Sequence, residues 1–287
     1  MLKIENVSKR KHTFELNHIS FDLPGGYIMG LIGENGAGKT TLLRIIAGLY
    51  SVDEGRLIFG RQDYAKAEAD IRQEIGVVFH GDMFDSSVSL AGNARRYGSF
   101  YPAYDENVLK HYANLFQLNM KKRYRQLSKG EKLKFALAFA LAHKPRLLLL
   151  DEPTANFDTE FRTGFFQVLR EYTGNGENSV ILSTHITSDI DKVADYLLYL
   201  REGGQILFGD IERIRGAYRM AAGEDYKLRL LKERVIHLEH GEYGSKALVR
   251  NSGSPFDPAL RIWEPSIEEL MYHMAKGGMQ HGSTDQL

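Results

Sequence analysis

The sequence of 287 residues contains no cysteine, and its positive and negative charges cancel. The lack of cysteine excludes disulfide bonds, thiolate metal sites and a cysteine nucleophile. Because 37 Lys and Arg residues balance 37 Asp and Glu residues, the chain as a whole is not attracted to nucleic acid or anionic lipid. We therefore expect no nucleic-acid partner, and any phosphate binding must come from a local site.

Long apolar runs are also missing. The longest, residues 136–142 and 147–150, are far shorter than the roughly 20 residues that a membrane-spanning helix needs. The first residues are already charged, which predicts no signal peptide. The chain is not expected to cross a bilayer by itself.

The chain does contain strand patterns that alternate with helical ones. Short strands are predicted at residues 2–7, 19–23, 27–32, 76–79, 146–150 and 180–185, and a hairpin at 196–208. Residues 91–143 are predicted to be mostly helical. Buried strands alternating with helices indicate an α/β sheet with helices on its faces, interrupted by a helical block.

The last part of the chain changes character. Helices are predicted around residues 225–238 and 266–274, with a turn-rich stretch at 251–258 between them. This pattern indicates a small appended unit.

One glycine-rich segment has the spacing of a phosphate-binding loop. Gly38, Lys39 and Thr40 follow Gly33 after four residues, between a buried strand and a helix. Glycines let backbone N–H groups approach a polyphosphate, and the helix N-terminus adds partial positive charge. Lys39 would pair with the terminal phosphates and Thr40 would ligate Mg²⁺; the alternative is a glycine-rich turn with an incidental lysine. The predicted nucleotide-binding residues of this loop are Gly33, Asn35, Gly36, Ala37, Gly38, Lys39, Thr40 and Thr41.

Two carboxylates end the leucine-rich strand at residues 147–150. Asp151 and Glu152 emerge at its carboxyl end, where open α/β sheets bind ligands. Adjacent strand residues point to opposite faces, so the two carboxylates have different roles. Asp151 is the candidate partner of Mg²⁺, and Glu152 the candidate that orients or deprotonates an attacking water. The alternative is an acidic turn at the end of a strand.

A second candidate anion site begins at Ser128. Ser128 and Glu131 have the spacing of a capping box at a helix start. A capping box does not require Gly130, and glycine inside a helix costs about 0.8–1.0 kcal/mol relative to alanine. Bare amides and a hydroxyl at a helix N-terminus also suit an anion, so both interpretations stay open.

Together these motifs resemble the ATP-binding cassette (ABC) ATPase family. The match runs over residues 1–215, in the order phosphate loop, Ser128 segment, Asp151–Glu152 pair and then Ser183-Thr184-His185. The resemblance implies a P-loop NTPase (RecA-like) α/β core over 1–83 and 145–215, with a helical subdomain at 84–144. It implies ATP and Mg²⁺ as cofactors and leaves a C-terminal extension at 216–287.

The same resemblance implies that two subunits enclose two ATP molecules. The loop of one copy would face Ser128 and Gly130 of the other, and residues 155–158 would contact the partner. The second subunit is either an identical chain or a sister ATPase. The implied catalytic residues are Glu152, His185 and Lys39, with His185 on the γ-phosphate; the implied metal residues are Thr40, Asp151 and His80.

Two positions depart from the family pattern. His80 stands where most members have glutamine, and Mg²⁺ prefers oxygen ligands. We expect His80 to bond to a Mg²⁺-bound water, or its loop to sense the transporter without touching the metal. Lys11 stands where an aromatic ring usually stacks on adenine, with His12 and Phe14 as nearby candidates.

The resemblance also implies a separate transmembrane permease that docks a short helix on the helical subdomain. Aromatic residues there would line a groove or form the subdomain core: Phe84, Tyr97, Phe100 and Tyr101. The segments at 14–30, 127–130, 183–189 and 265–271 resemble bacterial exporters of peptides, including phenol-soluble modulins, and of drugs. The expected function is ATP-driven export from the cytoplasmic side of the membrane; the alternative is a soluble ABC ATPase acting on ribosomes or DNA.

Overall fold

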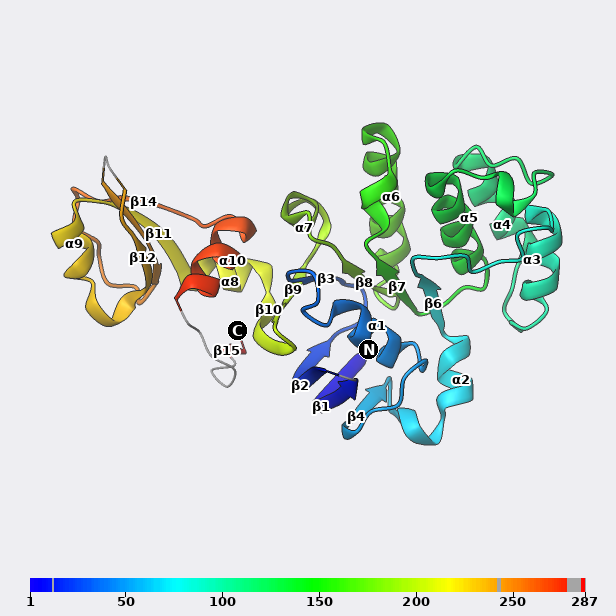
Figure 1. Ribbon diagram of the computed structural model, residues 1–287, viewed down its shortest axis with the longest axis horizontal. Coiled ribbons are helices and arrows are strands. Elements are labelled where there is room, and N and C mark those ends of the chain that lie inside the picture. Colours follow the sequence, from blue (N-terminus) through cyan, green and yellow to red (C-terminus); the bar gives the residue numbers. More distant parts are fainter. Residues whose placement is uncertain (12, 242–243, 278–284, 287) are drawn as a thin grey trace.

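The computed structural model describes residues 1–11, 13–241, 244–277 and 285–286. A large twisted sheet occupies the centre of the molecule, a block of helices lies at one end, and a small sheet lies at the other (Figure 1). Among the described residues, no helix is both long and apolar enough to span a membrane.

The large sheet has the strand order β5-β4-β1-β2-β10-β9-β3-β8-β7-β6, with β15 paired to β10. Parallel pairing links β6 to β7, β7 to β8, β8 to β3 and β3 to β9, whereas β9 and β10 pair antiparallel. The bounds of the strands are Leu2–Lys11 (β1), Phe14–Leu23 (β2), Ile28–Ile32 (β3), Glu54–Phe59 (β4), Gln62–Asp63 (β5), Ile75–Val78 (β6), Leu147–Asp151 (β7), Ser179–Ser183 (β8), Tyr196–Arg201 (β9), Gly204–Asp210 (β10) and Asp285–Gln286 (β15).

The central strands are buried on both faces. Every residue of β3, β7 and β8 is buried, and alternate residues enter two separate apolar clusters. Leu148 and Leu150 pack into one cluster, whereas Leu147 and Leu149 pack into the other. Helices cover both faces, which is why these strands appear in the sequence as continuous apolar runs.

The predicted strands of this sheet are confirmed, with β1 and β2 longer than expected. The antiparallel strands β4 and β5 were not predicted. The first three residues of β4 are exposed, so the strand lacks the apolar alternation by which a sequence pattern is recognised.

The helices of this part alternate with the strands. Their bounds are Lys39–Ile46 (α1), Glu68–Gln73 (α2), Thr159–Thr173 (α6), Thr187–Val193 (α7) and Ile211–Ala217 (α8), with short 3₁₀ turns at Tyr64–Lys66 (η1) and Pro153–Asn156 (η3).

The helical block contains α3 (Leu90–Gly98), α4 (Glu106–Leu115), η2 (Tyr124–Gln126) and α5 (Lys129–Ala142). This confirms the helical prediction for residues 91–143. In α5, all residues from Phe135 to Ala142 are buried, as expected of a helix packed on all sides.

The aromatic residues of the block play two parts. Phe84 is buried and packs against Phe135 and Phe139, so it belongs to the core. Phe100 is 68% exposed. Both nevertheless line one depression of about 280 Å³, together with Tyr97 and Tyr101, so core and groove share these side chains.

The C-terminal part forms a second sheet of four antiparallel strands, in the order β12-β13-β11-β14. Its elements are β11 (Tyr218–Gly223), α9 (Asp225–Arg229), η4 (Lys232–Arg234), β12 (Val235–Glu239), β13 (Ser245–Arg250), β14 (Arg261–Trp263) and α10 (Ile267–Lys276).

The predicted helix at 225–238 is wrong beyond Arg229, because residues 235–239 form the strand β12. Pairing with β13 decides this segment, since neighbouring strands outweigh a weak local helical preference. The predicted helix at 266–274 is confirmed as α10, whose Ser266 forms a capping box with Glu269. α10 packs against both the small sheet and α7 of the large part.

Candidate active site

The phosphate loop lies between β3 and α1, as predicted. Gly38 precedes α1 with φ 107, no side chain caps the helix, and no acidic residue lies in its first turn. The N–H groups at this helix start are therefore available to an anion. A Cβ at Gly33 would lie 2.3 Å from the carbonyl oxygen of Leu200, so only glycine allows the loop to pass β9 this closely.

Lys39 points back into the loop that it follows. Its ammonium donates hydrogen bonds to the carbonyl oxygens of Gly33 at 2.7 Å and Glu34 at 3.3 Å. Its Nζ also lies 3.5 Å from Oε1 of Glu152. Because Lys39 is only 6% exposed, its charge is held by these oxygens, which a bound triphosphate would replace as partners.

Asp151 lies beneath the loop and is 3% exposed. Its Oδ2 accepts a hydrogen bond from the Thr40 hydroxyl at 2.8 Å, and its Oδ1 accepts one from the Ser183 hydroxyl at 2.7 Å. Two oxygens on adjacent corners of a Mg²⁺ octahedron with bonds of 2.0–2.1 Å lie about 2.9 Å apart. The Thr40 and Asp151 oxygens therefore have the chemistry and spacing that suit Mg²⁺.

Glu152 occupies the turn after β7 in a left-handed conformation, φ 49. Its N–H donates to Ser183, which fixes the turn against β8. Its Oε2 accepts hydrogen bonds from the His185 backbone N–H at 3.2 Å and pairs with His185 Nδ1 at 2.7 Å. The structure thus brings together Lys39, Glu152 and His185, the three predicted catalytic residues.

A depression of about 360 Å³ opens above this group. Its lining consists of Lys11, Phe14, residues 34–41 and Glu152. Every predicted binding residue of the loop except Gly33 lines it. The depression has the position and composition of a nucleotide site.

At the edge of this depression, Lys11 is engaged with Tyr50, which sequence reasoning missed. The Lys11 ammonium donates to the Tyr50 hydroxyl at 2.7 Å, and Arg44 donates to the same hydroxyl at 2.8 Å. These hydrogen bonds, from Lys11 first and then Arg44, lower the pKa of Tyr50. Phe14 supplies an aromatic ring to the depression, and His12 lies outside the described residues.

Ser128 begins α5 and forms the predicted capping box. Its hydroxyl accepts from the Glu131 N–H at 3.1 Å, and the Glu131 carboxylate accepts from the Ser128 N–H at 2.8 Å. Ser128 is exposed, and neither Ser128 nor Gly130 lines the phosphate-loop depression. The helix-capping role of Ser128 is therefore confirmed. Its anion-binding role stays a prediction, because it requires the phosphate loop of a second chain.

His80 is exposed and lies in a different depression of about 390 Å³, which it shares with Asp82, Lys129 and Lys132. Lys132 and Asp82 form an ion pair there at 2.6 Å. The predicted metal residues Thr40 and Asp151 form a hydrogen bond, but His80 does not line the depression that contains Thr40. Its role at the metal stays a prediction, and its place beside Lys129 is a new observation.

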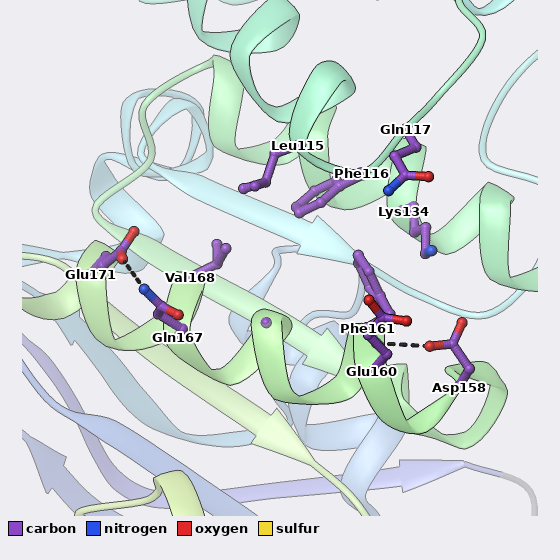
Figure 2. Close-up of a pocket in the computed structure, with 11 residues that line it drawn as sticks. Leu115, Phe116, Gln117, Lys134, Asp158, Glu160, Phe161, Gln167, Val168 and Glu171 are labelled. Atoms are coloured by element: carbon purple, nitrogen blue, oxygen red, sulfur yellow. Dashed lines mark hydrogen bonds between the residues drawn. The ribbon is translucent and has the colours of Figure 1, made fainter.

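A further groove separates the helical block from α6. Leu115, Phe116 and Phe161 line its apolar part, and Lys134 and Glu160 lie at its polar end (Figure 2). Asp158, the last residue of the predicted partner-contacting segment, caps α6 by accepting from the Phe161 N–H at 2.7 Å. This groove shares no lining residue with the phosphate-loop depression.

A phosphate loop, a buried carboxylate beside a threonine hydroxyl, and a glutamate–histidine pair at the ends of parallel strands define a nucleotide hydrolase of the P-loop class. Residues 16–155 match the family model described as ABC transporter.

Three curated relatives agree with this class. The chain is 26% identical to the ABC transporter ATP-binding protein YtrB of Bacillus subtilis over 273 residues, covering 93% of this chain and 92% of that protein. It is 30% identical to the lantibiotic transport ATP-binding protein SrtF of Streptococcus pyogenes over 210 residues, covering 72% of this chain and 90% of that protein. It is 35% identical to the aliphatic sulfonates import ATP-binding protein SsuB 3 of Pseudomonas syringae over 232 residues, covering 78% of this chain and 83% of that protein.

A solved ATP-binding cassette, a dimer in a post-hydrolysis state with ADP and phosphate, shares the fold, with a TM-score of 0.64. That match has 22% identity and covers 71% of this chain and 95% of the other. The chain belongs to the ABC transporter ATPase family, whose members bind ATP with Mg²⁺, hydrolyse it and work with separate membrane permease components.

Proposed function

We propose that two copies of this chain power the export of peptides or drug-like molecules through a separate permease, from the cytoplasmic side of the membrane. One observation carries the proposal. Each chain presents the phosphate loop and Glu152 in one depression, with His185 bonded to Glu152, whereas Ser128 lies outside the depression and is exposed at a helix start. Since both halves are present in the same sequence, two identical copies suffice for two complete sites.

In this proposal the loop and the Ser128 end of the partner close on one triphosphate. Lys39 exchanges the Gly33 carbonyl for phosphate oxygens. Thr40 and Asp151 would hold Mg²⁺, which would supply positive charge to the phosphates. Glu152, still oriented by His185, accepts the proton of the attacking water. Because ATP binds the closed arrangement better than the open one, hydrolysis lets the two copies separate and moves the permease.

Closure is coupled to transport through the helical block. The depression lined by Phe84, Tyr97, Phe100 and Tyr101 has an apolar floor and an exposed aromatic side chain, which suits a short helix from the permease. The His80 depression includes Lys129, next to Ser128, so it is placed to report permease contact to the second half of the site.

The proposal includes a direction of transport. SrtF is named for lantibiotic transport and SsuB 3 for sulfonate import, so relatives of both kinds support a transporter. The segments at 127–130, 183–189 and 265–271 favour export. Inside-out membrane vesicles that contain the chain and its permease test this directly: export predicts ATP-dependent uptake of a fluorescent cationic peptide, and import predicts none.

The alternative is a soluble ABC ATPase acting on ribosomes or DNA. The neutral net charge of the chain argues against a nucleic-acid partner. Affinity purification of the tagged chain from detergent-solubilised cells separates the two functions. Recovery of a multi-span membrane protein supports the transporter, whereas recovery of ribosomal RNA without such a protein supports the alternative.

A further inference from the structure

An ion pair with a fully buried carboxylate joins segments that adjoin the Glu152–His185 contact. Asp189, in the first turn of α7, is fully buried, and Thr154, in η3, is 2% exposed. The Thr154 hydroxyl donates to Asp189 Oδ2 at 2.7 Å. Arg162, on α6, approaches the same Oδ2 with its Nη2 at 3.1 Å. The cluster therefore joins η3, α6 and α7 through one carboxylate oxygen.

The other half of this ion pair makes no hydrogen bond within the described part of the chain: Asp189 Oδ1 and Arg162 Nε are both buried and lack a partner there. A buried carboxylate with an unmet acceptor is costly, and apolar residues often replace a buried ion pair without loss of stability. Packing alone therefore does not account for these residues.

The position of the cluster in the chain indicates what it does. Thr154 lies two residues after Glu152, and Asp189 lies four residues after His185. The Thr154–Asp189 hydrogen bond and the Glu152–His185 contact thus tie the same two segments together at two points. The Thr154–Asp189 hydrogen bond is buried and therefore shielded from water. In the Glu152–His185 contact, by comparison, the His185 side chain is 57% exposed.

We propose that Asp189 is a positioning residue for ATP hydrolysis, which acts with Thr154 and Arg162 to hold His185 against Glu152. The unpaired atoms are Arg162 Nε and Asp189 Oδ1. A rotation of the guanidinium would add a second hydrogen bond between these atoms to the existing contact of Nη2 with Oδ2. The pair thereby keeps α6 and α7 connected when they shift, and Glu152 keeps its orientation toward the attacking water.

The test compares Asp189→Asn with Asp191→Asn, a change of the same kind on α7, where Asp191 pairs with Arg215 at 2.8 Å. We expect Asp189→Asn to lower kcat by up to about 100-fold, the scale of a misplaced catalytic group, with little change in KM for ATP, because Lys39 and the loop are untouched. Asp191→Asn should keep the native kcat. The pH profile of kcat should also change for Asp189→Asn alone, since it reports the groups that act in the complex.

A double variant asks whether Asp189 acts through His185. If it does, Asp189→Asn combined with His185→Ala loses no more activity than His185→Ala alone, because both remove the same constraint. Multiplied losses in the double variant would overturn the proposal, as would a native kcat in Asp189→Asn or a rise in KM with kcat unchanged.

Thr154 provides a test that does not depend on the folding of Asp189→Asn. Thr154→Val removes the hydroxyl at nearly constant shape, whereas Thr154→Ser keeps it. We expect Thr154→Val to lower kcat several times more than Thr154→Ser at unchanged ATP affinity. Equal kcat values for the two variants would contradict the proposal.

Discussion

The two proposed halves of the hydrolysis site differ in how they are organised within one chain. On the phosphate-loop side, Glu152 contacts both Lys39 and His185, and Asp151 accepts a hydrogen bond from Thr40. On the Ser128 side, the residue is exposed, and within the described part of the chain its hydroxyl accepts a hydrogen bond from its own helix. The first half is organised within one chain, whereas Ser128 does not line the phosphate-loop depression. In the proposed two-chain site, a single chain therefore supplies the organised catalytic group, and its partner supplies the Ser128 segment.

The most severe test of the organised half removes the carboxylate of Glu152. We expect Glu152→Gln to lower kcat by about 10²–10⁴-fold, the usual contribution of a general base, while ATP still binds through Lys39 and the loop. Phosphate release measures the rate, and fluorescent nucleotide binding measures the affinity. Near-native turnover in this variant would show that Glu152 is not the base.

The incomplete half is tested by removing the Ser128 hydroxyl. Ser128→Ala should lower hydrolysis by about 10²-fold, as for one lost donor to a developing charge, and stability by about 1 kcal/mol for the lost cap. Ser89 caps α3 in the same way, accepting from the Gly92 N–H at 3.1 Å, so Ser89→Ala is the matched control. Equal losses of hydrolysis in both variants would mean that Ser128 is only a cap.

The metal part of the organised half depends on Asp151. We expect Asp151→Asn to lower the affinity for Mg²⁺ by about 10–100-fold, because an amide oxygen replaces a buried carboxylate beside Thr40. Hydrolysis measured across a Mg²⁺ titration gives this value, with the Mg²⁺-free affinity for ATP as the control. An unchanged Mg²⁺ midpoint would remove Asp151 from the metal site.

The smallest expected effect concerns the charge that holds the Ser128 cap. Hydrogen bonding from the Ser128 N–H lowers the pKa of Glu131 from its ordinary value of 4.5. A lowered folded-state pKa gives stability that is present above the unfolded pKa and lost as pH falls through the folded one. Thermal unfolding of Glu131→Gln should therefore depend less on acid below about pH 4.5 than that of the native chain. Identical acid dependence would contradict this.

The same comparison explains how much the sequence could predict. The phosphate loop and the Asp151–Glu152 pair each consist of neighbouring residues that follow a continuous apolar strand, so local patterns place them correctly. The contact of Lys11 with Tyr50 and that of Thr154 with Asp189 join residues 39 and 35 positions apart. Such contacts depend on how the strands and helices pack, and no local pattern records them.

The C-terminal part shows the same limit for secondary structure. Ser266 and Glu269 predict the start of α10, because they have the spacing of a local capping box. The strand β12 is fixed by its pairing with β13, and its residues are all partly exposed, so its periodicity is weak. Local signals therefore predict the helix, and only tertiary pairing produces the strand.

The central claim is that Ser128 and Gly130 of one copy complete the loop of another. Mixing two inactive chains tests it most directly. Lys39→Ala removes the ammonium of the phosphate loop and leaves the Ser128 segment unchanged. Gly130→Asp places a negative charge against the phosphates and leaves the phosphate loop unchanged. In a mixed dimer the intact loop and the intact Ser128 segment meet at one of the two sites. Because equal mixing makes about half of the dimers mixed, roughly a quarter of native hydrolysis should return. A mixture as inactive as its separate components would contradict the account.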